Sequence, residues 1–258
     1  MIAAGDWNAQ QYLEFERERT RPVVDLLNAV PLERVRAAAD VGCGPGNSTE
    51  VLAQRAPHAR LVGVDSSENM IAEARRRLPR ARFEVAQIAG WSDPGPYDLI
   101  LANAVLQWVP RHERVLPELL GKLGPGGSLA VQMPDNLSEP AHQLMRDIGT
   151  SGPWAARVAA AGRAPQPPAD WYYRLLAPRC ARVEIWRTVY FHPLARGADD
   201  IVDWFKGSAL KAYLSPLDCD EREVFLDRYR SAVSRAYPAM PDGTVLLPFP
   251  RLFIVAMR

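Results

Sequence analysis

A chain of 258 residues is long enough for one large α/β domain or for a domain with a modest insertion. Hydrophobic residues make up 48% and charged residues 24%, as in ordinary globular proteins, and a net charge of +1 gives no overall attraction to nucleic acid. The three cysteines lie far apart without metal-ligand spacing, so we expect no metal site and a reducing cytoplasm. Because no stretch approaches the roughly 20 apolar residues of a membrane span, we expect no membrane contact.

The first 30 residues predict helix and carry many charges. Between residues 7 and 29, four residues fall on one helix face because each follows the one before it by three or four positions: Tyr12, Phe15, Arg19 and Val23. The residue before proline avoids the helical region, so two helices that meet near Pro22 are expected instead of one. Two interpretations stay open for residues 1–30: an amphipathic helix packed on a sheet, or a helical lid over a binding site.

Short apolar strands alternate with helices in the next hundred residues. We expect strands at 37–41, 60–64, 82–86, 97–102 and 128–133, and a helix at about 112–123. Such alternation favours a parallel sheet that helices cover on both faces. Right-handed crossovers then bring the loops at the carboxyl ends of the strands to one crevice. These loops carry the glycine-rich turn after residue 41, Asp65, Gln87, Asn103 and Pro134.

The remainder of the chain is less regular. Helices are expected at 139–148, 198–210 and 216–237, and further strands at 182–190 and 251–257, the last of them antiparallel. The whole predicts an α/β fold with a mostly parallel seven-stranded sheet in a domain that spans residues 31–258. The segments at about 135–180 and 196–248 are expected to form a small helical cap.

The glycine-rich turn carries the strongest functional signal. Gly42, Gly44 and Gly46 alternate after an apolar strand, where a sharp turn and a close ligand need glycine. Asp65 ends the second strand, 19 residues after Gly46, where an open α/β sheet binds a ribose diol. The spacing is not G-x-G-x-x-G, because Asn47 holds the last glycine position, and no Lys-Ser/Thr follows. The alternative is a turn that binds nothing.

The stretch Asp40-Val41-Gly42-Cys43-Gly44-Pro45-Gly46 resembles the D-x-G-C-G-x-G loop of class I S-adenosylmethionine-dependent methyltransferases. The resemblance covers residues 31–133 and implies a Rossmann-like fold with S-adenosylmethionine as cofactor. The cofactor contacts that it implies are Gly42, Cys43 and Gly44 for the methionine portion, Asp65 for the ribose, Ser66, Met70, Gln87 and Ile88 around the adenine, and Asn103 on the sulfonium side. Members of the class usually have Asp in place of Gln87, whose oxygen still accepts a hydrogen bond but without charge assistance.

Four further stretches resemble trans-aconitate methyltransferases, so this closer resemblance runs nearly end to end. They are residues 11–22, 103–110, 130–136 and 248–253. The resemblance implies methylation of one carboxylate of trans-aconitate or a related polycarboxylic acid to a monomethyl ester.

A carboxylate with a pKa near 4 is already ionised at neutral pH, so the reaction needs no general base and we expect no catalytic proton-transfer residue. Arginine suits a substrate with several carboxylates, because its fork binds a carboxylate through two hydrogen bonds. The candidate substrate residues are Arg19 and Arg251, with Tyr12, Gln107, Trp108 and Tyr190 as shape and hydrogen-bond groups. For each of them a packing role is the alternative. His142 and His192 are expected to be surface or structural residues.

Two other functions stay open: a methyltransferase for a different small metabolite, and a protein that binds the cofactor for another purpose. A nucleic-acid methyltransferase is disfavoured, because Asn103-Ala104-Val105-Leu106 stands where an Asn/Asp-Pro-Pro-Tyr/Phe stretch would be needed. We expect a monomer or a weak homodimer.

Overall fold

The computed structural model describes residues 16–258, which form two compact units. The unit that we call the sheet unit comprises residues 16–134, 166–188 and 252–258. The unit that we call the helical unit comprises residues 135–165 and 189–251.

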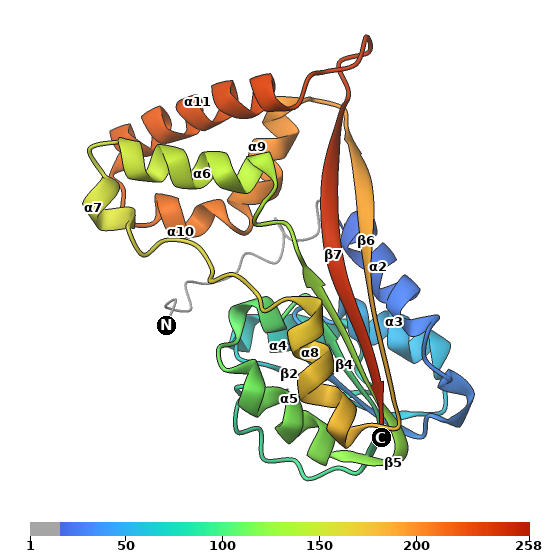
Figure 1. Cartoon of the computed structure of the whole chain (residues 1–258). Helices are drawn as coiled ribbons and strands as arrows, with labels where there is room; N and C mark the ends of the chain where they lie inside the picture. Colours follow the sequence, from blue (N-terminus) through green and yellow to red (C-terminus); the bar gives the residue numbers. More distant parts are fainter. Residues whose placement is uncertain (1–15) are drawn as a thin grey trace. The chain divides into compact units, whose positions relative to one another are not determined.

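In the described residues, seven strands form one sheet in the order β3-β2-β1-β4-β5-β7-β6 (Figure 1). They are β1 (Ala37–Val41), β2 (Arg60–Asp65), β3 (Arg82–Val85), β4 (Tyr97–Asn103), β5 (Leu123–Pro134), β6 (Arg182–Leu194) and β7 (Val245–Met257). The pairs among β1 to β5 are parallel. β7 is antiparallel to β5, because Arg258, after the end of β7, pairs with Gly126 and Gly127 near the start of β5. The predicted α/β fold with a mostly parallel sheet and an antiparallel last strand is confirmed.

Helices cover both faces of this sheet. The sheet unit contains α2 (Glu16–Leu27), α3 (Asn47–Arg55), α4 (Glu68–Arg77), α5 (His112–Gly121), α8 (Ala169–Leu176) and the short 3₁₀ helices η1 (Leu32–Arg34), η2 (Leu106–Trp108) and η3 (Ala177–Arg179).

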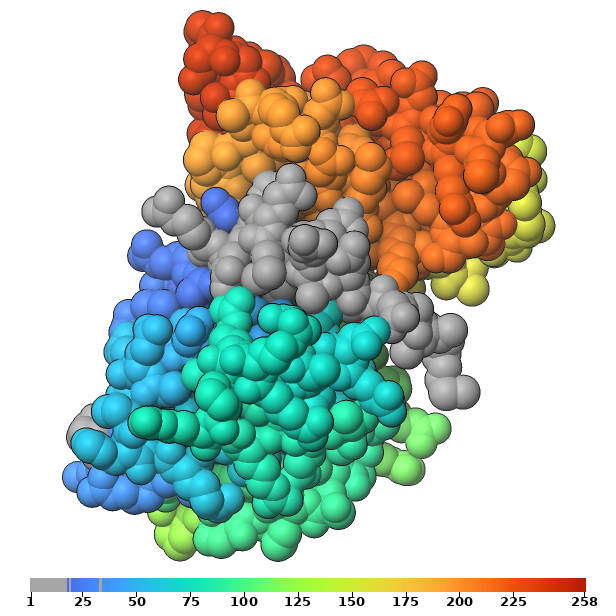
Figure 2. Space-filling view, turned by 180° about the vertical axis from the view of Figure 1, so that it is seen from behind, coloured from blue at the N-terminus to red at the C-terminus, as the bar shows by residue number. Residues whose placement is uncertain are grey.

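Successive side chains of β1 point to opposite faces of the sheet, and their contacts show on which face each helix lies. Ala39 and Val41 point into the core that contains Leu116 of α5 and Tyr172 of α8. Asp40 points the other way and accepts hydrogen bonds from two residues of α3. Helices α5 and α8 therefore share one face and α3 lies on the other, where Figure 2 shows α3 and α4 at the surface in blue and cyan.

Helix α2 runs without a break from Glu16 to Leu27 and contains Pro22, so the predicted break at this proline is wrong. An interior proline costs a helix roughly 3 kcal/mol, because it removes a hydrogen bond and crowds the preceding turn. Val23, Leu26 and Leu27 are almost fully buried, and α2 packs against α3 and β5. This burial offsets the cost of the proline.

The helical unit contains α6 (Pro140–Ser151), α7 (Ala155–Val158), α9 (Ala198–Lys206), α10 (Leu210–Leu214) and α11 (Cys219–Ala236), together with the ends of β6 and β7. Asp218 and Glu221 form a capping box that begins α11. α11 packs against α6 and α9 around buried Trp154, Phe225 and Tyr229. The predicted helix at 198–210 is interrupted after Lys206, and α10 follows as a separate helix.

No helix within residues 16–258 is long and apolar enough to cross a membrane.

Candidate functional site

The loop after β1 is held against β2 and against the segment that follows β4. The backbone N–H groups of Gly42 and Cys43 donate to the Val64 carbonyl oxygen at 2.6 and 3.0 Å. Gly42 has a φ of 75°, and a Cβ on it would overlap the side chain of Val105. Glycine is therefore required here both by the left-handed backbone and by the close approach of Val105.

Gly44 differs from Gly42, because a Cβ on it would meet nothing within 4 Å. Its φ of 54° again favours glycine, and its N–H donates to Oδ2 of Asp65 at 3.0 Å. The loop thus offers an open face of bare backbone next to a carboxylate. A ligand can approach this backbone closely.

Asp40 on β1 holds the start of α3 through side-chain hydrogen bonds. Its Oδ2 accepts hydrogen bonds of 2.7 Å from the hydroxyls of Ser48 and Thr49, while its buried Oδ1 accepts none from the described residues. Complete burial raises the pKa of Asp40 to about 6 and the negative charge of Asp65 adds to this, although the two hydroxyls oppose the shift. The carboxyl group therefore fixes the start of α3 directly behind the glycine loop.

Asp65 ends β2 and links the loop to α4. Its Oδ2 accepts from Gly44 and its Oδ1 accepts from the backbone N–H of Ser67 at 2.9 Å, and Ser67 caps α4. Burial raises the pKa of Asp65, against the effect of these backbone hydrogen bonds. Because a carboxylate oxygen has two acceptor positions, each oxygen retains one for a ribose hydroxyl.

The other residues predicted around the adenine lie at the same edge. Ser66 and Gln87 are exposed, whereas Met70 and Ile88 are buried. The N–H of Ala86 donates to the Asp65 carbonyl oxygen at 2.9 Å, which ties the segment after β3 to the end of β2.

β4 ends in Asn103, and the segment after it turns sharply. Asn103 Oδ1 is buried and has no hydrogen-bond partner among the described residues. Gln107 donates its Nε2 to the Ala104 carbonyl oxygen at 2.6 Å, which leaves its Oε1 as a buried acceptor without a partner in that part of the chain. Trp108 follows and is 37% exposed.

These groups fit S-adenosylmethionine. The cofactor brings an ammonium group and ribose hydroxyls as hydrogen-bond donors. Asp65 and Asn103 present carboxylate and amide oxygens, which accept hydrogen bonds. The bare backbone at Gly44 leaves room for close approach.

In the helical unit, Arg251 is charged but only 3% exposed, and it lies among aromatic rings. Its guanidinium lies over the ring of Phe249, with Cζ 4.7 Å from the ring centroid. His192 stacks on Trp204 at 4.7 Å and on Tyr190 at 6.3 Å between centroids. Burial lowers the pKa of His192 to about 4, and the charge of Arg251 adds to the effect.

A second histidine of the helical unit lies near other arginines. Burial lowers the pKa of His142 to about 3, with contributions from the charges of Arg163 and Arg146. Arg163 donates from Nη2 to Oδ1 of Asn136 at 2.8 Å. His142 and His192 are thus both buried, so a surface position is wrong for both and the structural role remains.

The predicted substrate residues divide between the two units. Gln107 and Trp108 share η2 in the sheet unit, and Tyr190 and Arg251 belong to the helical unit. Tyr12 and the side chain of Arg19 lie outside the described part of the chain. The hydrogen bond between Arg163 and Asn136 could not be predicted from the sequence, because the two residues are 27 positions apart.

Metal-ligating side chains do not gather in groups of three or more in the part of the chain that the structure describes. Cys43 is buried beside Asp40 and Asp65. Burial raises the pKa of its thiol well above the usual value, and the two negative charges add a smaller increase. This cysteine is therefore held as an uncharged thiol within the loop.

Comparisons agree with this geometry. A family model described as a methyltransferase domain matches residues 38–127. The crystal structure of the YcgJ protein from Bacillus subtilis superposes with a TM-score of 0.60 at 11% identity and covers 94% of this chain and 98% of that one. Fold and site together define a class I S-adenosylmethionine-dependent methyltransferase.

Two curated relatives match almost the whole chain. The trans-aconitate 2-methyltransferase of Methylobacterium radiotolerans is 53% identical and that of Rhodopseudomonas palustris is 51% identical. The alignments cover 98% of this chain in both cases, and 98% and 99% of the two relatives. The chain belongs to the trans-aconitate 2-methyltransferase family.

Proposed function

We propose that this protein transfers the methyl group of S-adenosylmethionine to one carboxylate of trans-aconitate, or of a related polycarboxylic acid. The products are a monomethyl ester and S-adenosylhomocysteine. The observation that carries the proposal is the 53% identity to a trans-aconitate 2-methyltransferase over 98% of the chain. The match therefore includes the helical unit as well as the glycine loop.

The reaction requires positioning more than proton transfer. Bound S-adenosylmethionine supplies a methyl group on a sulfonium, and an ionised carboxylate attacks it in line with the departing sulfur. The protein must hold the carboxylate oxygen roughly 3–3.5 Å from the methyl carbon and exclude water. A carboxylate with a pKa near 4 is ionised at neutral pH, so no side chain has to accept a proton.

The proposed cofactor residues keep the roles that the class resemblance implies. Asp65 binds the ribose hydroxyls, and the glycine loop with Asn103 faces the methionine portion. The complete proposed set is Gly42, Cys43, Gly44, Asp65, Ser66, Met70, Gln87, Ile88 and Asn103.

The proposed substrate residues are Tyr12, Arg19, Gln107, Trp108, Tyr190 and Arg251. Arg251 supports this role through its chemistry, because a buried guanidinium pairs well with a carboxylate. Gln107 uses one hydrogen of its Nε2 for the Ala104 carbonyl oxygen, which leaves the second hydrogen as a donor and its Oε1 as an acceptor. Gln107 thus keeps one donor for a substrate carboxylate.

Three finer statements belong to the same proposal. Residues 1–30 act as a lid over the site, as their charged helical pattern suggests. The protein works in the cytoplasm, which the three unpaired cysteines support. It acts on small acids as a monomer or weak homodimer and does not bind nucleic acid, in line with its net charge of +1.

The test is an assay with purified protein, S-adenosylmethionine and trans-aconitate. S-adenosylhomocysteine formation and the mass of the product are followed together, and a monomethyl ester is expected. Asp65→Ala should weaken cofactor binding about 100-fold, because it removes hydrogen bonds to a charged group worth roughly 1.5–3 kcal/mol each. Asp170→Ala removes an exposed carboxylate on α8 and should change nothing.

Absence of turnover in protein that still binds S-adenosylhomocysteine would remove trans-aconitate as the substrate. Other acids, and then other acceptors, would be tried next. The class of the enzyme would stand.

A further inference from the structure

The short helix η2 carries Gln107 and Trp108 and is held through three successive carbonyl groups. The Ala104 oxygen accepts from Gln107 Nε2 at 2.6 Å, and the Val105 oxygen accepts from the Trp108 N–H at 2.9 Å. The Leu106 oxygen accepts from the Val109 N–H at 2.9 Å and also lies 2.8 Å from Nε2 of His112.

The backbone before η2 is strained. Ala104 has a φ of 53°, in the left-handed region that a residue with a Cβ rarely adopts. This conformation costs roughly 1–2 kcal/mol and persists only where surrounding contacts determine it. Contacts from outside η2 must therefore help to hold the segment in place.

His112 provides such a contact, and its protonation pattern follows from its partners. A carbonyl oxygen only accepts, so Nε2 of His112 must carry the hydrogen that points at Leu106. Nδ1 lies 2.7 Å from the hydroxyl of Tyr172 and, in the neutral ring, accepts its hydrogen. The Leu106 carbonyl oxygen thus selects the Nε2–H form of His112, and the Tyr172 hydroxyl, which can donate or accept, donates to Nδ1.

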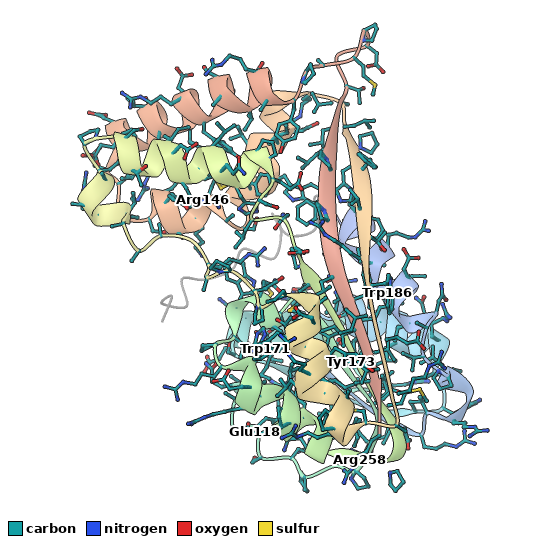
Figure 3. All side chains as sticks on the ribbon, viewed as in Figure 1. Glu118, Arg146, Trp171, Tyr173, Trp186 and Arg258 are labelled. Atoms are coloured by element: carbon teal, nitrogen blue, oxygen red, sulfur yellow. The ribbon has the colours of Figure 1, made fainter. Side chains whose placement is uncertain are left out.

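Tyr172 is itself immobilised by packing. Its side chain is fully buried, and its ring meets the ring of Trp171 edge to face at 5.2 Å. Both residues lie on α8, which packs against α5, the helix that His112 begins. Figure 3 shows these two helices side by side, with Trp171 and Tyr173 labelled on α8 and Glu118 on α5.

We propose that His112 is a positioning residue for methyl transfer and that Tyr172 completes its role. Together they anchor η2 from α8 and so orient Gln107 and Trp108 toward the substrate. This inference rests on the proposed function for the role of these two side chains, but the anchoring itself does not depend on any activity.

Tyr172→Phe tests the proposal, because it removes one hydroxyl and keeps the ring. Tyr97→Phe is the matched control, since Tyr97 is also fully buried in the same core and its hydroxyl lies against Asp93, at the amino end of β4. Tyr172→Phe should lower kcat/KM for trans-aconitate about tenfold with unchanged affinity for S-adenosylhomocysteine. Tyr97→Phe should leave both values within twofold of the wild type.

Replacement of His112 gives a second test with a rescue. Gln can donate to the Leu106 carbonyl oxygen and accept from Tyr172, so His112→Gln should keep most of the activity. His112→Leu can do neither and should lose at least tenfold in kcat/KM.

Hydrogen exchange separates this inference from the proposed function. The amides of Trp108 and Val109 should exchange faster in Tyr172→Phe and in His112→Leu than in the wild type or in Tyr97→Phe. Equal exchange in all of these proteins would overturn the anchoring, whatever substrate the enzyme turns over. Equal kcat/KM for Tyr172→Phe and Tyr97→Phe would overturn the positioning role. If the wild type leaves trans-aconitate unchanged, the proposed function fails and the exchange data alone decide the anchoring.

Discussion

Gly42 and Gly44, two glycines of the loop after β1, lack a side chain for different physical reasons. At Gly42 the space is filled by Val105, so a Cβ would disturb the fold itself. At Gly44 the space is open, so a Cβ would meet only an incoming ligand. The first glycine therefore serves the packing of the loop and the second serves binding.

Gly44→Ala should separate binding from stability. The left-handed backbone strain should cost about 1–2 kcal/mol of stability, while the new methyl group should weaken binding of S-adenosylhomocysteine at least tenfold. Gly126→Ala is the control, because Gly126 has a φ of 76° and equally open surroundings but lies before the long parallel part of β5. It should lose similar stability and bind normally. Calorimetry of both variants measures the two effects, and normal binding by Gly44→Ala would contradict the assignment.

The buried carboxyl of Asp40 should make stability depend on pH. Its folded-state pKa of about 6 lies above the unfolded value of roughly 3.9, so between these values only the folded state keeps the proton. The stability that this proton gives is complete below about pH 4 and is lost as the pH rises through 6.

The asparagine in Asp40→Asn does not titrate, so this variant lacks the pH-dependent contribution that the Asp40 proton makes to stability. Its unfolding free energy relative to the wild type should therefore rise by about 2 kcal/mol between pH 4 and pH 7.5. Urea unfolding at several pH values measures the difference, with Asp170→Asn on the exposed surface of α8 as the control. A constant difference across the range would show that Asp40 is not the titrating group.

At the scale of single elements, the carboxyl end of helix α5 accepts hydrogen bonds from the side chain of Arg258. Arg258 donates from Nη1 to the Leu123 carbonyl oxygen at 2.7 Å and reaches those of Leu120 and Gly121 at 3.4 and 3.5 Å. The last carbonyl groups of a helix have no partner within the helix, so a cation placed here satisfies them. Figure 3 labels Arg258 at this position.

Arg258→Ala should therefore destabilise the protein by about 1 kcal/mol, the usual worth of such a hydrogen bond. Arg258→Lys keeps one donor and should recover part of the loss. Thermal unfolding measures both variants. Equal melting temperatures for wild type and Arg258→Ala would show that these bonds contribute nothing.

The elements that could be predicted from the sequence are those whose own pattern determines them. Strands β1 to β4 and the glycine loop follow from apolar runs and turn residues, and their positions agree within one residue. β7 was expected from residue 251 but begins at Val245, because Pro248 and Pro250 hide the strand from a pattern that treats proline as a terminator. A proline is tolerated where its missing N–H is not needed, and Pro250 still accepts from Asp135 at 2.8 Å. Helix α8 was not expected, although Tyr172 and Leu176 lie four positions apart and share its buried face.

The site shows the same limit. Asp65 and the glycines could be predicted, because a local turn and a strand end determine where they lie. The contact between His112 and Tyr172 could not, since it joins residues 60 positions apart through tertiary packing. The burial of Arg251 and His192 likewise depends on how distant strands and helices meet.

At the scale of the whole molecule, the chain passes between the sheet unit and the helical unit four times within residues 16–258. The expected cap segments at about 135–180 and 196–248 overlap the helical unit, although α8 belongs to the sheet unit. Neither unit is therefore a single stretch of chain. The separate segments of each unit must come together during folding, and contacts between residues far apart in the sequence form slowly.

The two halves of the helical unit also depend on each other chemically. The backbone N–H of Ala141, from the first half, donates to the hydroxyl of Tyr237, from the second, at 2.9 Å, and α6 packs against α11. A recombination event with one breakpoint between residues 166 and 188 would combine halves from different parents and break this match. Transplanting the helical unit between relatives thus takes two simultaneous grafts, so its two inserts are expected to be inherited as a pair.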